Sequence, residues 1–218
     1  MSKELGLIGR RNYLLKRNPR LDELKISFKI FFSNPTAVAG LVITLLYFID
    51  TFLVQFFPWA IGIHDPNQYI INPYNPVPTP PSPQHPLGTT YGGIDLLDAI
   101  LKSIRVDVEY TLLIVLSGAL IGLVLGLVSG FFGGIMDEIL MRITDIFFSI
   151  PYLVLAIGFS PTANIPELGY LTSLGLNFVS IAPWAVIIPG LVITIFALAV
   201  NLMGDGLRDV IDPRRRSV

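Results

Sequence analysis

The sequence predicts an all-α polytopic membrane protein with four transmembrane helices and both termini in the cytoplasm. Of the 218 residues, 52% are hydrophobic and 14% are charged, and the mean hydropathy is +0.66, which is a membrane composition. Eight cations precede the first apolar run and four follow the last, whereas residues 58–93 and 158–182 contain no Lys or Arg. Because cytoplasmic loops carry the excess of cations, both termini are expected in the cytoplasm.

The N-terminal segment 1–35 combines many cations with an amphipathic pattern. Four apolar residues recur at helical spacing and predict a helix lying on the inner membrane surface, although a helix that docks on a partner protein would look the same. These residues are Leu21, Leu24, Phe28 and Phe31. The apolar run that follows is too long for the core of a signal peptide, so it is interpreted as an uncleaved first span. The cations are Lys3, Arg10, Arg11, Lys16, Arg17, Arg20, Lys25 and Lys29.

The first transmembrane helix is expected at 36–57, which is long enough to cross roughly 30 Å of hydrocarbon. Asp50 interrupts this run. An acid inside a span is a functional hypothesis; the alternative is that Asp50 lies near the outer boundary or pairs with another helix.

Residues 58–109 are expected outside the membrane. Nine prolines within 58–93 predict an extended, irregular loop with polyproline character. A short interfacial helix is then expected over 94–108, where Asp98 and Lys102 form an i,i+4 pair. Lys102 and Arg105 would lie on the outer side, as a minor exception to the charge distribution. The apolar face of this helix consists of Ile94, Leu97, Leu101, Ile104 and Val108.

Three further spans are expected at 110–132, 137–157 and 183–203, followed by a basic cytoplasmic tail at 204–218. In the last span, Trp184 suits a membrane interface and Pro189 predicts a kink. The tail contains Arg208 and Arg214–Arg216.

The span at 137–157 is unusually short. After Asp145 the apolar run has 14 residues, 146–159, against the usual span of about 20. Without this crossing the four-arginine tail would face outward, against the charge distribution, so the segment is expected either to cross or to be interrupted by a missing stretch.

A ladder of four glycines marks the second span. In lipid, helices associate through close packing, and small residues at four-residue spacing let two backbones approach. The ladder therefore predicts a groove for another helix and a central place for this span among neighbours. Its members are Gly118, Gly122, Gly126 and Gly130.

No catalytic or metal-binding residue is expected. The chain has no cysteine, which excludes disulfides and thiolate metal sites. His64 and His85, the only histidines, both lie in the proline-rich loop. The net charge of −1 offers no argument for a nucleic-acid partner, and none is expected.

Three stretches carry a resemblance to a known family. HPLGTTYGGIDLLDAI, IGLVLGLVSGFFGGIMDEILMRITDIFFSIP and NLMGDGLRDVIDPR, in this order, resemble permease subunits of ABC importers of the dipeptide/oligopeptide/nickel type, and more narrowly the C-type subunit of the permease pair. The residues concerned are His85, Pro86, Leu87, Gly88 and Thr89; Gly133, Gly134, Asp137, Glu138, Met141, Arg142, Asp145 and Pro151; and Asn201, Gly204, Asp205, Arg208, Asp209, Asp212 and Pro213.

The resemblance implies one half of a translocation pathway in the plasma membrane of a prokaryote. The implied partners are a second permease subunit, forming a heterodimer, two cytoplasmic ATP-binding subunits and an extracellular substrate-binding protein, with membrane lipid around the spans. The chain has no GxxxxGK[ST] stretch, so ATP and Mg²⁺ would be bound by the partner ATPases and this chain would not be an enzyme. Peptides, nickel and oligosaccharides all remain open as substrates.

The sequence departs from the family in two places. Thr90 and Gly93-Ile94-Asp95 stand where the family has an acid and then Gly-Arg-Asp, which weakens any role for those charges. The cytoplasmic EAA-type coupling loop is absent, and two of the six spans of the family are missing with it at a seam near 157–158. The gap is on the order of 80 residues and is either a genuine deletion or a gap in the sequence. The alternative function is therefore a non-transporting membrane scaffold or a decayed permease without ATPase coupling.

Each motif has two interpretations. Glu138, Arg142 and Asp145 either gate the pathway or form ion pairs at the cytoplasmic mouth that hold two spans together. The segment 204–213 either contacts the ATPase or ends the last helix, with Gly204 and Gly206 as helix breakers. His85 to Gly88 either meet the binding protein or form a structured turn.

Overall fold

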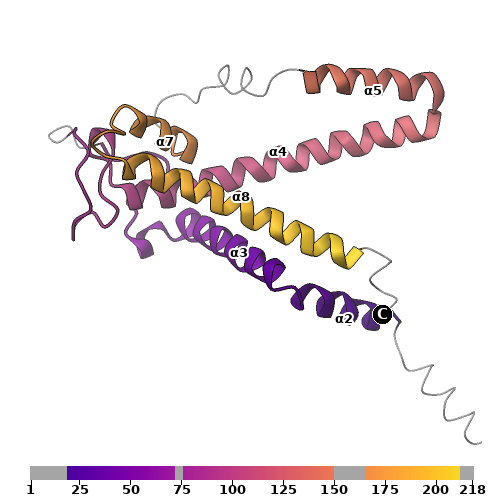
Figure 1. Cartoon of the computed structure of the whole chain (residues 1–218), viewed down its shortest axis with the longest axis horizontal. Helices are drawn as coiled ribbons and strands as arrows, with labels where there is room; N and C mark the ends of the chain where they lie inside the picture. The colour runs from indigo at the N-terminus through magenta and orange to yellow at the C-terminus, as the bar shows by residue number, and fades with distance from the viewer. Residues whose placement is uncertain (1–18, 72–75, 150–164, 212–218) are drawn as a thin grey trace, which may run out of the picture. The chain divides into compact units, whose positions relative to one another are not determined.

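The computed structural model describes residues 19–71, 76–149 and 165–211. Figure 1 shows the helices in chain order, and in the described residues they are joined by turns and loops without a strand. The helices are α2 (Pro19–Phe32), α3 (Pro35–Phe56), η1 (Pro58–Ile61), η2 (Tyr91–Gly93), α4 (Leu96–Phe132), α5 (Gly134–Ser149), α7 (Leu168–Leu176) and α8 (Trp184–Ile211). The prediction of an all-α protein is confirmed.

Three of the described helices, α3, α4 and α8, are long and apolar enough to cross a membrane. They correspond to the spans expected at 36–57, 110–132 and 183–203. The segment 137–157 begins within α5, and its last part, residues 150–157, lies outside the described residues, as does the seam near 157–158. The count of four spans and the cytoplasmic placement of the termini therefore stay predictions.

The described residues fall into two compact units, whose boundaries lie within α3 and α8. The first comprises the residues up to Leu46 and those from Thr194 onward, and the second comprises Tyr47–Ile193.

In the first unit, α3 begins at a side-chain cap and packs closely on α8. The Oδ1 atom of Asn34 accepts the backbone N–H of Thr36 at 3.1 Å and its hydroxyl at 2.7 Å, which satisfies a donor at the helix start. A Cβ added to Gly40 would lie 2.6 Å from the Ala199 carbonyl oxygen. At Gly206 the backbones also approach so closely that an added Cβ would overlap that of Ala37.

The N-terminal amphipathic helix is present as α2, but its predicted apolar face is divided. Phe31 is buried, and its ring lies against Gly206 of α8. Phe28, one turn earlier on the predicted face, is 62% exposed. The helix therefore both packs on the protein and presents apolar side chains outward.

In the second unit, the expected interfacial helix and second span form one continuous helix. α4 runs for 37 residues through the boundary expected at 109–110, so the expected interfacial helix leads into the second span without a break. The reason is that no Gly or Pro interrupts residues 96–117. The first part of α4 is buried on several sides rather than along one stripe, because its N-terminal turns contact α7 and the preceding loop. Buried positions include Leu96, Ala99, Ile100, Lys102 and Val106.

Two glycines turn the chain at the far end of α4. Gly133 and Gly134 have φ angles of +58° and +53°, a region that residues with a Cβ adopt rarely. α5 folds back there and contacts α4, as Figure 1 shows.

The last helix continues beyond its predicted end. α8 runs for 28 residues to Ile211, through Gly204 and Gly206, so the interpretation of these glycines as helix breakers at the end of a 183–203 span is wrong. Gly206 instead serves the close approach of α8 to α3, and a packing contact of this kind can outweigh the helix cost of glycine, about 1 kcal/mol.

Candidate functional site

The HPLGT segment forms a compact turn before α4. The backbone N–H of His85 donates to the Ser82 carbonyl oxygen at 3.1 Å, and the N–H of Ser82 donates back to the His85 carbonyl at 2.9 Å. The His85 carbonyl also accepts the N–H of Gly88 at 2.8 Å. These bonds satisfy backbone groups that a proline-rich loop cannot pair in a helix or sheet.

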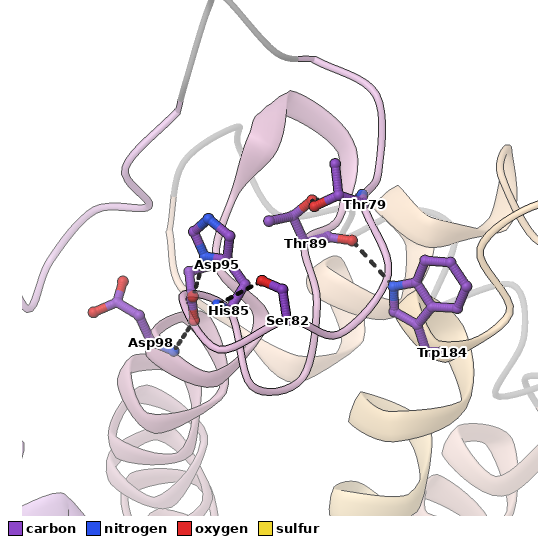
Figure 2. Close-up of polar contacts among 7 residues, drawn as sticks. All are labelled: Thr79, Ser82, His85, Thr89, Asp95, Asp98 and Trp184. Atoms are coloured by element: carbon purple, nitrogen blue, oxygen red, sulfur yellow. Dashed lines mark hydrogen bonds and ion pairs between the residues drawn. The ribbon is translucent and has the colours of Figure 1, made fainter.

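One carboxylate joins this turn to α4, as Figure 2 shows. Asp95 Oδ2 lies 2.6 Å from His85 Nδ1, while Asp95 Oδ1 accepts the N–H of Asp98 at 3.0 Å as the N-cap of the helix. The N–H of Leu96 donates to the Gly88 carbonyl at 3.1 Å. The turn therefore sets where α4 begins.

The same turn is also tied to α8. Thr89 and Thr79 pair through a backbone bond of 3.0 Å and a hydroxyl contact of 2.9 Å. The indole N–H of Trp184, at the start of α8, donates to the Thr89 carbonyl at 3.3 Å (Figure 2). Gly88 has a φ of +79°, and an added Cβ would lie 2.7 Å from the Thr79 carbonyl oxygen and 2.8 Å from Trp184 Nε1. No other residue fits this position without a clash.

The motif is thus a structured turn that organises the starts of two candidate spans. Pro86 is exposed and Leu87 half-buried within it. Asp95, a position discounted because it departs from the family pattern, holds the central contact with His85. A role of His85 to Gly88 in meeting a binding protein stays a prediction.

Two cations of α4 are buried and hold the preceding loop. Lys102 is 0% exposed; its Nζ lies 2.7 Å from Asp98 Oδ2 and donates to the Gln68 carbonyl oxygen at 3.2 Å. The expected i,i+4 pair is confirmed. The two cations do not lie on a free outer surface, however, because the loop covers them.

Arg105 reaches three neutral acceptors instead of an acid. Its guanidinium donates to Gln55 Oε1, to Asn67 Oδ1 at 3.0 Å and to the Pro66 carbonyl oxygen at 3.4 Å. These bonds connect α4 to the end of α3 and to the loop. Arg105 Nε is buried without a hydrogen-bond partner among the described residues.

Tyr69 connects the loop, α4 and α7. Its hydroxyl lies 2.8 Å from Ser103 Oγ and 3.1 Å from the Glu167 carbonyl oxygen, and it accepts the Glu167 N–H at 3.0 Å. Burial raises the pKa of Tyr69 to about 12, because the ionised phenol is poorly solvated there. Burial also raises the pKa of Glu167. Asp107 Oδ2 accepts the N–H of Leu168 at 3.3 Å, at the start of α7.

Sequence reasoning missed this cluster of Tyr69, Ser103, Asp107 and Glu167. One signal was available: Lys102, Ser103, Arg105 and Asp107 crowd six consecutive positions. Polar residues so close together cannot share the water-facing stripe of an interfacial helix, so some of them must be bonded inside the protein.

The motif around the α4–α5 turn lies at the surface. Ser129 Oγ donates to Asp137 Oδ1 and so links the two helices. Arg142 and Glu138 form an ion pair of 3.1 Å within α5, with side chains 76% and 67% exposed. Asp145 is exposed on the same helix. This pair lies within one helix, and the two interpretations of these charges, as a gate of the pathway or as ties between two spans, stay predictions. Pro151 lies outside the described residues.

The C-terminal motif and the glycine ladder are also exposed. Asn201, Gly204, Asp205 and Arg208 are exposed and Asp209 is half-buried, while Asp212 and Pro213 lie outside the described residues. A Cβ added to Gly118, Gly122, Gly126 or Gly130 would meet no atom within 4 Å in the described residues. The partner helix expected for the ladder therefore stays a prediction.

Comparison with known proteins places this chain beside peptide transporters. No family model matches it. The dipeptide transport system permease protein DppC of Haemophilus influenzae is 53% identical over 60 residues, which is 28% of this chain and 20% of that protein. DppC of Escherichia coli is 47% identical over 58 residues, 27% of this chain and 19% of that protein.

A further relative carries the name di/tripeptide transport system permease protein DppC, from Pseudomonas aeruginosa, and is 41% identical over 63 residues, 29% of this chain and 20% of that protein. The chain spans about a fifth of the length of the curated relatives it matches. Over the matched part, the resemblance stated from the motifs is confirmed: the curated relatives of this chain are peptide ABC transport permeases of the DppC type.

Proposed function

We propose that this chain is a membrane-spanning permease subunit of an ABC importer and forms half of a translocation pathway for peptides or similar small solutes. The observation that carries the proposal is the identity of 41–53% to peptide transport permeases from several bacteria. The proposal includes a location in the plasma membrane of a prokaryote as a multi-pass protein.

The geometry supports this role in two ways. Three described helices are long and apolar enough to span a membrane, and the HPLGT turn bonds to the starts of two of them, through Asp95 for α4 and Trp184 for α8. The exposed apolar length of α4, with its glycine ladder, offers a surface for another membrane helix.

The partners follow from the proposed role. A second permease subunit would complete the pathway, two cytoplasmic ATP-binding subunits would bind ATP and Mg²⁺, and an extracellular binding protein would deliver substrate. This chain contributes binding surfaces and a pathway rather than catalysis. Within this proposal, the segment 204–213 contacts the ATPases.

Reconstitution tests the proposal directly. The chain is co-expressed with a second permease subunit, two ATPases and a binding protein of the dipeptide type, and assembled in proteoliposomes. We expect uptake of labelled dipeptide and ATP hydrolysis that rises when the binding protein is added. An ATPase variant that cannot hydrolyse ATP is the control, and should abolish uptake without dissolving the assembly.

The coupling segment that the sequence is expected to lack defines the result that would contradict this proposal. If the purified chain has an intact mass near 24.0 kDa and binds the partners without supporting uptake or stimulated hydrolysis, it is a scaffold or decayed permease and the proposal is wrong. A mass heavier by two helices and a loop shows that the coupling segment belongs to the chain.

A further inference from the structure

An apolar groove lies in the first unit between α2 and α8. Its volume is about 390 Å³. The groove is apolar along both walls, and Ser27 is the polar residue among the residues that line it. The main lining residues are Phe28, Phe31 and Phe32 of α2 and Met203, Leu207 and Val210 of α8.

The groove has a fixed floor and an open mouth. Phe31 is 8% exposed and rests against Gly206, where an added Cβ would come within 3.1 Å of its ring. Phe28 and Phe32, which stack with ring centroids 6.1 Å apart, are 62% and 54% exposed. An apolar patch of this kind on a small unit marks a binding surface for an apolar group.

Two exposed lysines of α2 neighbour the aromatic residues of this mouth along the helix. Lys25 precedes Phe28 by three residues and Lys29 precedes Phe32 by three, a spacing that puts each lysine and the following phenylalanine on adjoining positions of the helix surface. Both lysines are exposed. The adjoining sequence strengthens this charge, because residues 1–33 contain eight cations and three acids.

We propose that this groove binds an anionic glycerophospholipid. One acyl chain lies against Phe28, Phe32 and Leu207, and the headgroup phosphate contacts Lys25 and Lys29. An apolar channel with neighbouring lysines matches an amphiphile with an apolar tail and a negative head, and the cytoplasmic leaflet, where the N-terminus is proposed to lie, is the one rich in such lipids. A helix of a partner protein would fill the channel but leave the lysines uncompensated unless it carried acids.

The proposal requires that the chain resides in a membrane and does not depend on transport. Its failure and the failure of the permease proposal are therefore separable, since lipid binding is measured on the purified chain without ATPases or binding protein.

Native mass spectrometry of the full 218-residue chain tests the site. The detergent-solubilised protein is titrated with phosphatidylglycerol or with phosphatidylcholine of the same acyl chains. We expect bound phosphatidylglycerol in preference to phosphatidylcholine. Lys25→Gln and Lys29→Gln should each reduce this preference about fivefold, while Arg142→Gln, which removes an exposed cation far along the chain, should leave it unchanged.

A second set of variants, which fill the groove with larger side chains, tests the proposed position of the acyl chain. Leu207→Trp and Val210→Phe place bulk against the proposed acyl chain and should each reduce binding of both lipids. Two filling variants are used so that the result does not rest on one substitution, and circular dichroism confirms that each remains helical. The proposal is overturned if both variants bind lipid as strongly as the unsubstituted protein does. The same result is expected if a helix of a partner protein, rather than a lipid, occupies the groove. The proposal is equally overturned if Arg142→Gln loses the preference as much as the lysine variants.

Discussion

The imidazole of His85 and the carboxylate of Asp95 meet at 2.6 Å, and the same carboxylate caps α4 through the N–H of Asp98 at 3.0 Å. A single side chain thus fixes both the loop and the helix start. Because the loop in turn holds Trp184 through Thr89, a change at Asp95 reaches the beginnings of two candidate spans.

Asp95→Ala removes both contacts, whereas His85→Ala removes one. We expect Asp95→Ala to lower the free energy of unfolding by about 1–2 kcal/mol and His85→Ala by about 1 kcal/mol, measured by unfolding in mixed micelles. The double variant should cost less than the sum, because both changes delete one shared interaction. Asp205→Ala, at an exposed position of α8, is the control and should have an effect within about 0.5 kcal/mol. Strict additivity of the two substitutions would contradict the contact.

Alanine substitutions at Gly88 and Gly62 distinguish the energetic cost of backbone strain from that of a steric clash. Both glycines have φ near +80°, at +79° and +77°, but an added Cβ clashes at Gly88, whereas at Gly62 it meets no atom within 4 Å among the residues that the structure describes. Gly62→Ala should therefore lower the free energy of unfolding by about 1–2 kcal/mol through strain. Gly88→Ala should cost about 1–3 kcal/mol more, because the Thr79 carbonyl and Trp184 must move. Equal losses in thermal unfolding would show that Gly88 is not tightly enclosed.

The glycine ladder and Gly40 should respond oppositely to alanine. A Cβ added at Gly122 meets no atom within 4 Å in the described residues, and Gly122→Ala improves helix propensity by about 1 kcal/mol, so the isolated chain should not be destabilised. Gly40→Ala forces α3 away from α8, where the Cβ would lie 2.6 Å from the Ala199 carbonyl, and should be destabilising.

The same ladder variant should weaken association with a second permease subunit, because a methyl group at the close approach separates two helices. Co-purification measures this association, with Gly190→Ala as the control, since Gly190 also has open space for a Cβ. Unchanged association of Gly122→Ala would show that the ladder does not serve that contact.

Two ion pairs with the same i,i+4 spacing should differ in energetic value. Lys102 is fully buried beside Asp98, whereas Arg142 and Glu138 are both exposed. Lys102→Met leaves the Asp98 carboxylate and the Gln68 carbonyl without their donor, and we expect a loss of about 2–3 kcal/mol in the free energy of unfolding. Arg142→Met should change it by no more than about 0.5 kcal/mol. A small loss at Lys102 would mean that water replaces the ammonium.

The raised pKa of Tyr69 predicts that the folded protein loses stability at high pH. This pKa rises from the ordinary value of 10.0 to about 12 in the folded protein, so the folded state holds this proton more tightly than the unfolded state does. The stabilisation is complete below pH 10 and is lost as the pH rises through about 12.

Tyr69→Phe should lower stability at neutral pH, because the hydroxyl contacts with Ser103 and Glu167 are lost, and should flatten the decline between pH 10 and 12. Thermal unfolding at several pH values measures both effects, and Tyr110→Phe, at an exposed tyrosine, is the control. A decline of the same size in Tyr69→Phe would assign it to other groups.

The elements that sequence reasoning located are those specified by local chemistry. Apolar length predicted α3, α4 and α8, and the run of prolines before residue 94 predicted a loop. The interpretation of Gly204 and Gly206 as the end of the last helix was wrong, because α8 continues through both glycines to Ile211. At 109–110, where the expected span begins, α4 is also continuous. The polarity of the side chains changes along a helix where its surroundings change from protein to lipid, but the backbone hydrogen bonds of the helix can continue through that point.

Residue pattern and hydrophobic length therefore established the class of protein, the places of three long helices and the likeness to peptide permeases. Long-range packing decided the rest: that Asp95 pairs with His85, that Lys102 and Arg105 are buried by a loop, and that Tyr69 meets Ser103 and Glu167. Hydrophobic periodicity reports only whether a side chain avoids water. Which partner a polar side chain finds depends on where distant segments cross, and Tyr69 and Glu167 are 98 residues apart in the chain.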